Sequence, residues 1–233
     1  MPLKVLCDFD GTISQTDTTD AIFDRFAPSW RGIEALWEAG EIGSAECMRR
    51  QVELMDASLP ELDEALDELE IDPTFPEFAR FCEGAGIELV IVSDGIDHFV
   101  RRILQRAGLR HLPVRANRLI QRGQRRYSLA HPHKVAGCTT RAGTCKCARA
   151  ASECEGRRAV LVGDGRSDFC LSHKADIVFA KKSLLAYART NGIQAFEYAD
   201  FTQVQAVLES VLLAGPYRLT FANASFATPA NWK

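Results

Sequence analysis

The chain has 233 residues, enough to bury one substantial core together with a smaller inserted domain. Its formal net charge of −3 provides no domain-wide positive field, so neither nucleic acid nor a membrane surface is expected as a partner. We find no apolar stretch of the roughly 20 residues that span a bilayer and no signal segment, and we expect a cytoplasmic protein whose eight cysteines stay reduced.

The first predicted element is a buried strand around Leu3, Val5 and Leu6 that ends in two carboxylates, Asp8 and Asp10. In open α/β sheets, ligands bind at the carboxyl ends of the strands. An aspartate there is a candidate nucleophile toward phosphorus, and a second carboxylate could protonate a leaving group and then take a proton from water. Taken alone, the same pattern also fits a surface turn.

A helical segment follows. Between residues 16 and 75 the apolar positions repeat with a helical period, which predicts about four helices and no strand. Breaks fall at Pro28, at 40–43 and at 58–60, and the last of these begins a helix with acidic residues in its first turn. The aromatic and Met positions in this segment favour a small packed core over a ligand site.

After Pro76 the pattern returns to alternating helices and strands. Two further apolar runs end in polar residues: 88–92 before Ser93, and 159–162 before Gly163. The remaining predicted elements are a strand at 112–114, a hairpin at 115–129, strands at 177–179 and 195–198, a closing helix at 201–213 and a tail at 215–233.

Four ordered motifs resemble those of the haloacid dehalogenase superfamily, in its phosphatase branch. They are Asp8-Phe9-Asp10-Gly11-Thr12, Ser93-Asp94-Gly95, Lys146, and Gly163-Asp164-Gly165-Arg166-Ser167-Asp168. The resemblance implies an α/β fold in which a Rossmann-like parallel sheet, flanked by helices, forms a core from residues 1–15 and 76–233. It also implies that residues 16–75 form an inserted small α-helical cap over the active site.

Within that branch, the chain is similar to the phosphoserine-phosphatase-like group. A cysteine-rich segment at 137–147, which contains Cys145-Lys146, resembles most closely the methionine-salvage members. Those enzymes act on 2-hydroxy-3-keto-5-methylthiopentenyl 1-phosphate. The expected function is therefore hydrolysis of a small-molecule phosphate ester, with phosphoserine or another small phosphomonoester as the alternative substrate.

The chemistry of phosphoryl transfer assigns roles to the first and last motifs. Asp8 would attack phosphorus to give an aspartyl phosphate, and Asp10 would act as acid and then as base. Repulsion between the two anions requires a hard divalent cation, and a small octahedral oxygen shell indicates Mg²⁺. Its expected ligands are Asp8, the backbone carbonyl of Asp10 and Asp164, with Asp168 beside them to orient Lys146 or a metal-bound water.

The second and third motifs would hold the phosphoryl oxygens. Ser93 and Lys146 would do so with their side chains, and Asp94 and Gly95 with their backbone amides. Lys134 also lies upstream of the last motif. We favour Lys146 because 17 residues separate it from Gly163, which suits one helix and a return to the sheet.

Specificity is expected to come from the cap. Related phosphoserine phosphatases use an acidic residue after the first motif to bind the amino group, and Asp17 could occupy that place. They use a cap arginine for the carboxylate, where this chain has Gln51 preceded by Arg49 and Arg50. Arg49 and Arg50 are candidate substrate-binding residues or, equally, part of a solvated helix face.

Three cysteines crowd the segment around Lys146. Cys138, Cys145 and Cys147 lie near His131 and His133 in the sequence, so both a zinc site and a loop of free thiols are open. Two other classes of function also remain: a phosphotransferase or mutase, and a non-catalytic metal-binding module. The sequence leaves the oligomeric state unknown.

Overall fold

The computed structural model describes residues 2–213, which are built around one seven-stranded sheet. The strand order is β4-β3-β2-β1-β5-β6-β7, and every neighbouring pair is parallel except β3 and β4. The strands are β1 (Leu3–Cys7), β2 (Glu88–Ile96), β3 (Val114–Gln121), β4 (Tyr127–Ala130), β5 (Arg158–Gly163), β6 (Ile177–Ala180) and β7 (Phe196–Glu197). The predicted α/β class with a mostly parallel sheet is confirmed.

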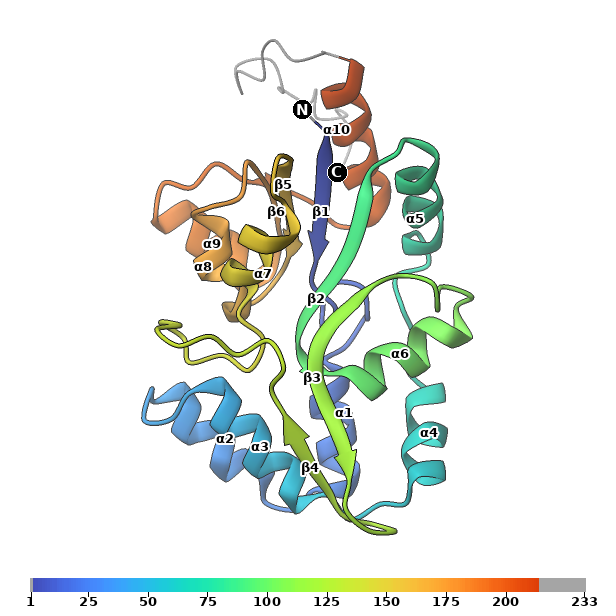
Figure 1. The fold of residues 1–233 in the computed structure, drawn as a ribbon, viewed down its shortest axis with the longest axis vertical. Coiled ribbons are helices and arrows are strands. Elements are labelled where there is room, and N and C mark those ends of the chain that lie inside the picture. Colours follow the sequence, from blue (N-terminus) through green and yellow to red (C-terminus); the bar gives the residue numbers. More distant parts are fainter. Residues whose placement is uncertain (1, 214–233) are drawn as a thin grey trace, which may run out of the picture.

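Helices occupy both faces of this sheet (Figure 1). They are α1 (Thr18–Phe26), α2 (Trp30–Glu38), α3 (Ser44–Leu54), α4 (Leu59–Asp67), α5 (Phe75–Gly84), α6 (Asp97–Arg106), α7 (Lys146–Glu153), α8 (Phe169–Ser172), α9 (Lys182–Thr190) and α10 (Phe201–Leu213), with a 3-10 turn at Arg166–Asp168. None of the helices among residues 2–213 combines the length and apolar character that crossing a membrane requires. The cytoplasmic location stays a prediction.

Side-chain alternation along the strands divides the core into two layers. In β1, Val5 and Cys7 face one apolar cluster, whereas Leu6 faces the other. The larger cluster is covered by α5, α6 and α10, and the smaller one by α7, α8 and α9. Because β1 is fully buried between these layers, the residue that follows it is held in a rigid place.

The four helices α1 to α4, which we call the cap helices, lie between β1 and β2 in the sequence. The break predicted at 58–60 begins α4: the Ser58 hydroxyl accepts a hydrogen bond from the backbone N–H of Glu61, and the Glu61 carboxylate accepts one from the backbone N–H of Ser58. Helix α1 begins at Asp17, whose carboxylate accepts from the N–H of Asp20. The division into a cap at 16–75 and a core stays a prediction.

The hairpin differs in extent from its prediction. Of the predicted strand at 112–114, only Val114 lies in a strand: it begins β3, which pairs with β2 in parallel and then with β4 in antiparallel fashion. The turn of this hairpin, which contains Gly123, lies between β3 and β4. The predicted tail at 215–233 falls outside the described residues.

Candidate active site

The carboxyl ends of three strands meet in the middle of the sheet. β1 lies between β2 and β5, and its last residue, Cys7, pairs with Ile91 and with Val162. Asp8 follows β1 directly, Asp164 follows β5, and Ser93 lies two residues beyond Ile91. The topology therefore brings the polar residues of three motifs to one edge of the sheet.

Lys146, the third motif in the sequence, also lies at this edge. It is the first residue of α7, its exposed fraction is 2%, and its ammonium group lies 2.7 Å from Asp8 Oδ1. The same ammonium donates to Asp168 Oδ1 at 2.7 Å and to the Ser167 hydroxyl at 2.8 Å. Lys146 is thus held between two carboxylates, with its charge close to the predicted nucleophile.

Burial governs the charges of this group. Burial acts to lower the pKa of Lys146, but the charges of Asp168 and Asp8 and their hydrogen bonds raise it above its usual range. Burial and the charge of Asp168 raise the pKa of Asp8 well above its usual range, and Lys146 opposes that shift. Another cation beside Asp8 would favour the ionised carboxylate that a nucleophile needs.

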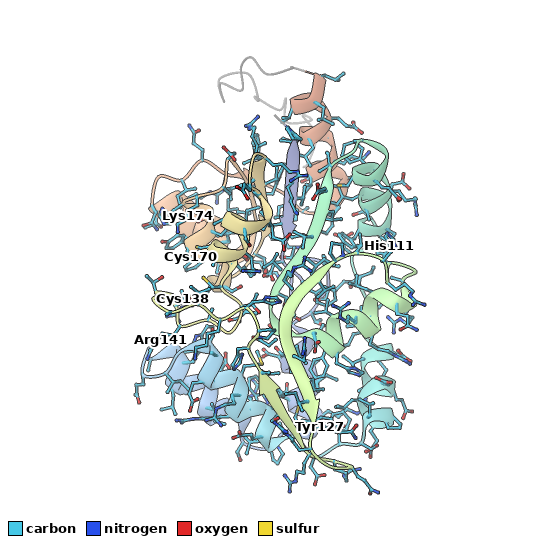
Figure 2. All side chains as sticks on the ribbon, in the orientation of Figure 1. His111, Tyr127, Cys138, Arg141, Cys170 and Lys174 are labelled. Atoms are coloured by element: carbon cyan, nitrogen blue, oxygen red, sulfur yellow. The ribbon has the colours of Figure 1, made fainter. Side chains whose placement is uncertain are left out.

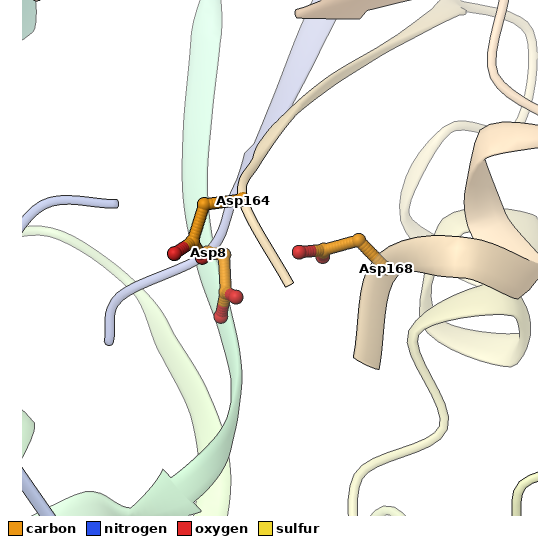
Figure 3. Close-up of side chains that lie close together, drawn as sticks. All are labelled: Asp8, Asp164 and Asp168. Atoms are coloured by element: carbon orange, nitrogen blue, oxygen red, sulfur yellow. The ribbon is translucent and has the colours of Figure 1, made fainter. Parts of the chain in front are cut away.

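Three carboxylates form a site that suits such a cation. Oxygen atoms of Asp8, Asp164 and Asp168 all lie within 4.8 Å of one another, and each residue is buried (Figure 3). Asp164 accepts hydrogen bonds from the Thr12 hydroxyl at 3.1 Å and from Lys182 at 3.0 Å. An all-oxygen donor set with this excess of negative charge fits Mg²⁺.

Asp168 differs from the other two carboxylates in how its oxygens are used. Oδ1 accepts from Lys146, and Oδ2 accepts from the Gly165 N–H at 3.3 Å. Its exposed fraction is 0%. Its contacts therefore suit the orientation of Lys146 better than direct ligation of a metal ion.

Asp10 lies opposite Ser93, with one side facing the first cap helix. Its Oδ1 accepts hydrogen bonds from the backbone N–H of Thr18 at 2.9 Å and from the Thr18 hydroxyl, and its Oδ2 accepts from the Ser93 hydroxyl at 3.4 Å. Burial and the charge of Asp17 raise the pKa of Asp10 to about 7, although the bonds from Thr18 lower it. A carboxyl group with this pKa can both donate and accept a proton near neutral pH.

Two glycines allow this close approach. Gly11 has φ +68°, the left-handed region that a residue with a Cβ rarely adopts, and Asp164 occupies the place that its side chain would need. A Cβ on Gly95 would lie 2.5 Å from Asp10 Oδ2. The Gly95 N–H donates to the Ser93 hydroxyl oxygen at 2.8 Å, which sets the position of that hydroxyl.

A cavity of about 480 Å³ opens above these residues. Its floor contains Asp8, Asp10, Ser93 and Asp164, all from the strand ends. Its roof comes from the cap helices and the turn between α2 and α3. Roof residues include Asp20, Glu34, Trp37, Ile42, Met48 and Gln51.

The structure brings only some of the predicted substrate-binding residues to the cavity. Asp17 lines it and caps α1, whereas Arg49 and Arg50 are absent from its wall. Both arginines bind Glu46 on the same helix, at 2.8 and 2.7 Å. The prediction that Arg49 and Arg50 contact substrate is not supported, because their direction on α3 turns them to the solvated face.

Gln51, at the predicted place of an arginine, is 2% exposed and donates to Glu34 Oε2 at 2.6 Å. Glu34 and Lys182 also line the cavity, although the sequence motifs predicted neither of them. Lys182 could have been found by the rule that placed the other residues, because it follows the predicted strand at 177–179 and lies just beyond β6. It has φ +47°, an uncommon conformation that often marks a functional site. Glu34 gave no signal beyond an ordinary helical charge.

Lys134, the rival of Lys146, and the cysteines proposed as zinc ligands lie away from the floor of the cavity. Lys134 is exposed and lines a different cavity, outside the floor, where Cys138 also lies. Figure 2 shows Cys138 on the loop before α7 and Cys170 on the neighbouring helix α8. Within residues 2–213, the group of His, Cys, Asp and Glu side chains placed to share one metal ion is the Asp8, Asp164 and Asp168 set, without any cysteine. The described geometry therefore does not support the predicted zinc alternative.

Known proteins resemble this chain in sequence. The family model of haloacid dehalogenase-like hydrolases matches residues 5–173. A protein of Brevibacillus brevis named 2-hydroxy-3-keto-5-methylthiopentenyl-1-phosphate phosphatase is 31% identical over 215 residues, which cover 90% of this chain and 96% of that protein. A protein of the same name from Geobacillus kaustophilus is also 31% identical and covers 89% of this chain and 96% of its own length.

Solved structures share the fold. A phosphoserine phosphatase described as a phospho-aspartyl intermediate analogue has a TM-score of 0.67 at 22% identity, covering 88% of this chain and 98% of that chain. An unliganded probable phosphoserine phosphatase from Vibrio cholerae has a TM-score of 0.70 at 19% identity, covering 92% of this chain and 66% of that chain. The TM-scores establish a common fold.

Proposed function

Because the chain belongs to the haloacid dehalogenase-like hydrolases and is a phosphatase, we propose that it hydrolyses 2-hydroxy-3-keto-5-methylthiopentenyl 1-phosphate with the help of Mg²⁺. Because this family consists of hydrolases, its match argues against the alternative of a non-catalytic metal-binding module. The observation that carries the choice of substrate is the pairing of Gln51 with Glu34: Gln51 stands where the similar phosphoserine phosphatases have a carboxylate-binding arginine, and here it is a neutral amide that donates to a carboxylate.

In the proposed reaction, an Asp8 oxygen attacks phosphorus in line with the ester oxygen. The bond from phosphorus to the ester oxygen breaks, and Asp10 gives its proton to the leaving oxygen. Asp10 then takes a proton from water, whose oxygen attacks phosphorus and releases inorganic phosphate, restoring Asp8 and protonated Asp10.

Other residues hold the phosphoryl group during both steps. The Lys146 ammonium, beside Asp8, and the Ser93 hydroxyl, beside Asp10, donate to the phosphoryl oxygens. Asp168 keeps Lys146 in place. Mg²⁺, held by Asp8, the Asp10 carbonyl and Asp164, would neutralise the charge that develops on the phosphoryl oxygens.

Charge at the roof supports a substrate without a carboxylate. Burial, followed by the negative charges of Asp17 and Glu34, raises the pKa of Asp20 to about 7. The basic residues among the described wall residues are engaged: Lys182 pairs with Asp164 at 3.0 Å, Arg141 donates to the Gly40 carbonyl at 2.9 Å, and the Arg166 guanidinium lies 5.0 Å from the centre of the Trp37 ring. A carboxylate placed beside Glu34 would meet like charge.

The roof also provides an apolar part. Trp37, Ile42 and Met48 line it together, and such a surface suits a methylthio tail, since sulfur packs well against aromatic rings. Oxygen atoms of Glu34 and Asp20 can accept hydrogen bonds from a substrate hydroxyl. A hydroxyl-bearing ester with a thioether tail therefore fits better than phosphoserine.

The test is release of inorganic phosphate from a panel of small esters, with Mg²⁺ or with EDTA. We expect the methylthiopentenyl ester to have the highest kcat/KM, and EDTA or Asp8→Asn to abolish release. A preference for phosphoserine would instead support the alternative substrate. Consumption of ester without free phosphate, together with a phosphorylated second alcohol, would indicate a phosphotransferase or mutase.

A further inference from the structure

Asp94 has a side chain that the proposed reaction does not use. It lies in β2 between Ser93 and Gly95, at the edge of the floor. Its Oδ2 accepts a hydrogen bond from the Ser44 hydroxyl at 2.6 Å, and its Oδ1 accepts one from the backbone N–H of Thr144 at 2.7 Å. Ser44 is the first residue of α3, whereas Thr144 lies two residues before Lys146. One carboxylate thus joins a cap helix, the phosphate-binding turn and the lysine-bearing segment.

A buried amide fixes Asp94 from behind. Asn117, whose exposed fraction is 0%, donates from Nδ2 to the Asp94 carbonyl at 2.5 Å and to Oδ1 at 3.2 Å. Its Oδ1 is left to accept from His131 Nδ1 at 2.8 Å and from the Thr144 hydroxyl at 3.5 Å. Since both ends of the amide are engaged, Asp94 and Thr144 are held in one arrangement.

The same side of the cap makes further contacts with the segment before Lys146. The N–H of Ala45 donates to the Arg141 carbonyl at 3.2 Å, and the Arg141 guanidinium donates to the Gly40 carbonyl. Figure 2 shows Arg141 on this loop, beside α2 and α3. The turn that carries Ile42 is therefore attached through Arg141 to the segment that leads to Lys146.

The other side of the cap is attached differently. Helix α4 is joined to α6 by the exposed ion pair of Asp67 with Arg102, at 2.5 Å, and by His98 with Asp63, at 2.7 Å. These groups are absent from the cavity wall. Of these two attachments, only the one through Asp94 lies next to reacting groups.

We propose that Asp94 is a positioning residue, whose carboxylate couples closure of α2 and α3 over the substrate to the placement of Ser93 and Lys146. When Ser44 donates to it, the roof lies against the floor and a long substrate is enclosed. When that bond opens, Oδ2 loses its partner and faces a cavity that must receive an anionic phosphoryl group, which disfavours binding in the open arrangement. The proposal depends on phosphatase activity but not on which ester is the natural substrate.

Two substrates test the coupling. One is the ester that the unaltered enzyme hydrolyses most efficiently, and the other is acetyl phosphate, which is too short to reach the roof. For Ser44→Ala we expect KM for the long ester to rise about tenfold, with a change in kcat/KM for acetyl phosphate below about threefold. Ser44 makes no side-chain cap bond to its own helix, so its loss leaves α3 intact.

Asp94→Ala removes both the bond to Ser44 and the bond to Thr144. We expect KM for the long ester to rise and kcat to fall for both substrates, because Thr144 and hence Lys146 lose a fixed neighbour. Adding Ser44→Ala to Asp94→Ala should raise KM no further, since the two share one bond. Asp94→Asn, which keeps an acceptor, should restore part of kcat.

The matched control is Asp67→Asn, which removes a contact between the cap and the core away from the site. It should leave unchanged the ratio of the kcat/KM values for the two substrates. Two results would overturn the proposal. One is an equal fall in kcat/KM for both substrates in Ser44→Ala, and the other is additive effects of Ser44→Ala and Asp94→Ala on KM for the long ester. If Asp94→Ala does not fold, the substrate ratio of Ser44→Ala alone decides. Absence of turnover of every ester by the unaltered enzyme would instead contradict the phosphatase assignment.

Discussion

The floor and the roof of the cavity are built from different kinds of structure. The floor rests on β1, all five of whose residues are buried, and its charged groups bind one another closely. The roof draws on several elements, and two of its residues, Glu34 and Trp37, come from α2. In α2, Trp30 is the buried residue and the N-cap, Ser29, makes no side-chain bond. The reacting groups thus lie on the most deeply buried strand, whereas part of substrate selection falls to a helix that is less buried in the core.

The largest effect is expected at the floor from Asp8→Asn. The amide cannot attack phosphorus, so kcat should fall by at least about 10³-fold. The measurement is phosphate release at saturating ester and Mg²⁺, with circular dichroism to verify the fold. Substantial remaining turnover by a folded variant would mean that Asp8 is not the nucleophile.

Lys146→Met should break both activity and stability. It leaves Asp8 and Asp168 buried without their shared cation, which costs about 3 kcal/mol or more of the free energy of unfolding. Urea denaturation measures this cost, and Lys134→Met is the control because Lys134 is exposed. Equal effects of the two changes would contradict the assignment of Lys146 to the site.

The pH dependence tests Asp10, whose pKa is raised to about 7. Formation of the aspartyl phosphate needs the protonated form and should slow as pH rises above 7. Its hydrolysis needs the ionised form and should slow as pH falls below 7. We expect kcat to pass through a maximum near neutral pH, with limbs approaching about tenfold per pH unit.

Asp20 is the control for that profile, because its pKa is also raised to about 7 and it lines the same cavity. Asp20→Asn should keep both limbs. A kcat that stays flat from about two pH units below that pKa to about two above it, or limbs that vanish in Asp20→Asn, would remove Asp10 from its role as acid and base.

At the roof, Glu34→Gln should change selection rather than chemistry. Removing one negative charge should raise kcat/KM for phosphoserine relative to an uncharged-tail ester by about fivefold, or about 1 kcal/mol. Gln51 keeps an oxygen acceptor in this variant. Glu38→Gln, on the same helix but away from the cavity wall, should leave the ratio unchanged. A similar shift in both variants would point to net charge instead of the roof.

The smallest effect is expected from Arg49→Ala and Arg50→Ala. Their ion pairs with Glu46 lie along one exposed helix face, and each such pair contributes only about 0.2–0.5 kcal/mol to stability. Their kcat/KM values should change less than about twofold for every ester. A tenfold loss of kcat/KM for one ester would instead indicate that these arginines contact the substrate.

The sequence alone determined the elements that carry the floor. Apolar runs followed by Asp8, Ser93 and Asp164 predicted three buried strands, because continuous apolar runs are typical of strands covered on both faces. The family resemblance implied that these strands lie parallel, which brings their ends to one edge of the sheet. The distance along the chain also favoured Lys146 over Lys134, and the structure places Lys146 against Asp8. Both inferences depend on local features of the sequence: the runs of apolar residues that form the strands, and the number of residues that one helix needs between Lys146 and Gly163.

Only the tertiary structure decided the roof and its link to the floor. Arg49, Arg50 and Gln51 are consecutive on α3, yet Gln51 alone reaches the cavity, since the turn of a helix sends neighbouring side chains in different directions. The bonds of Asp94 with Ser44 and Thr144 each join residues 50 positions apart. Such contacts depend on how whole elements pack together, and no local pattern encodes that arrangement.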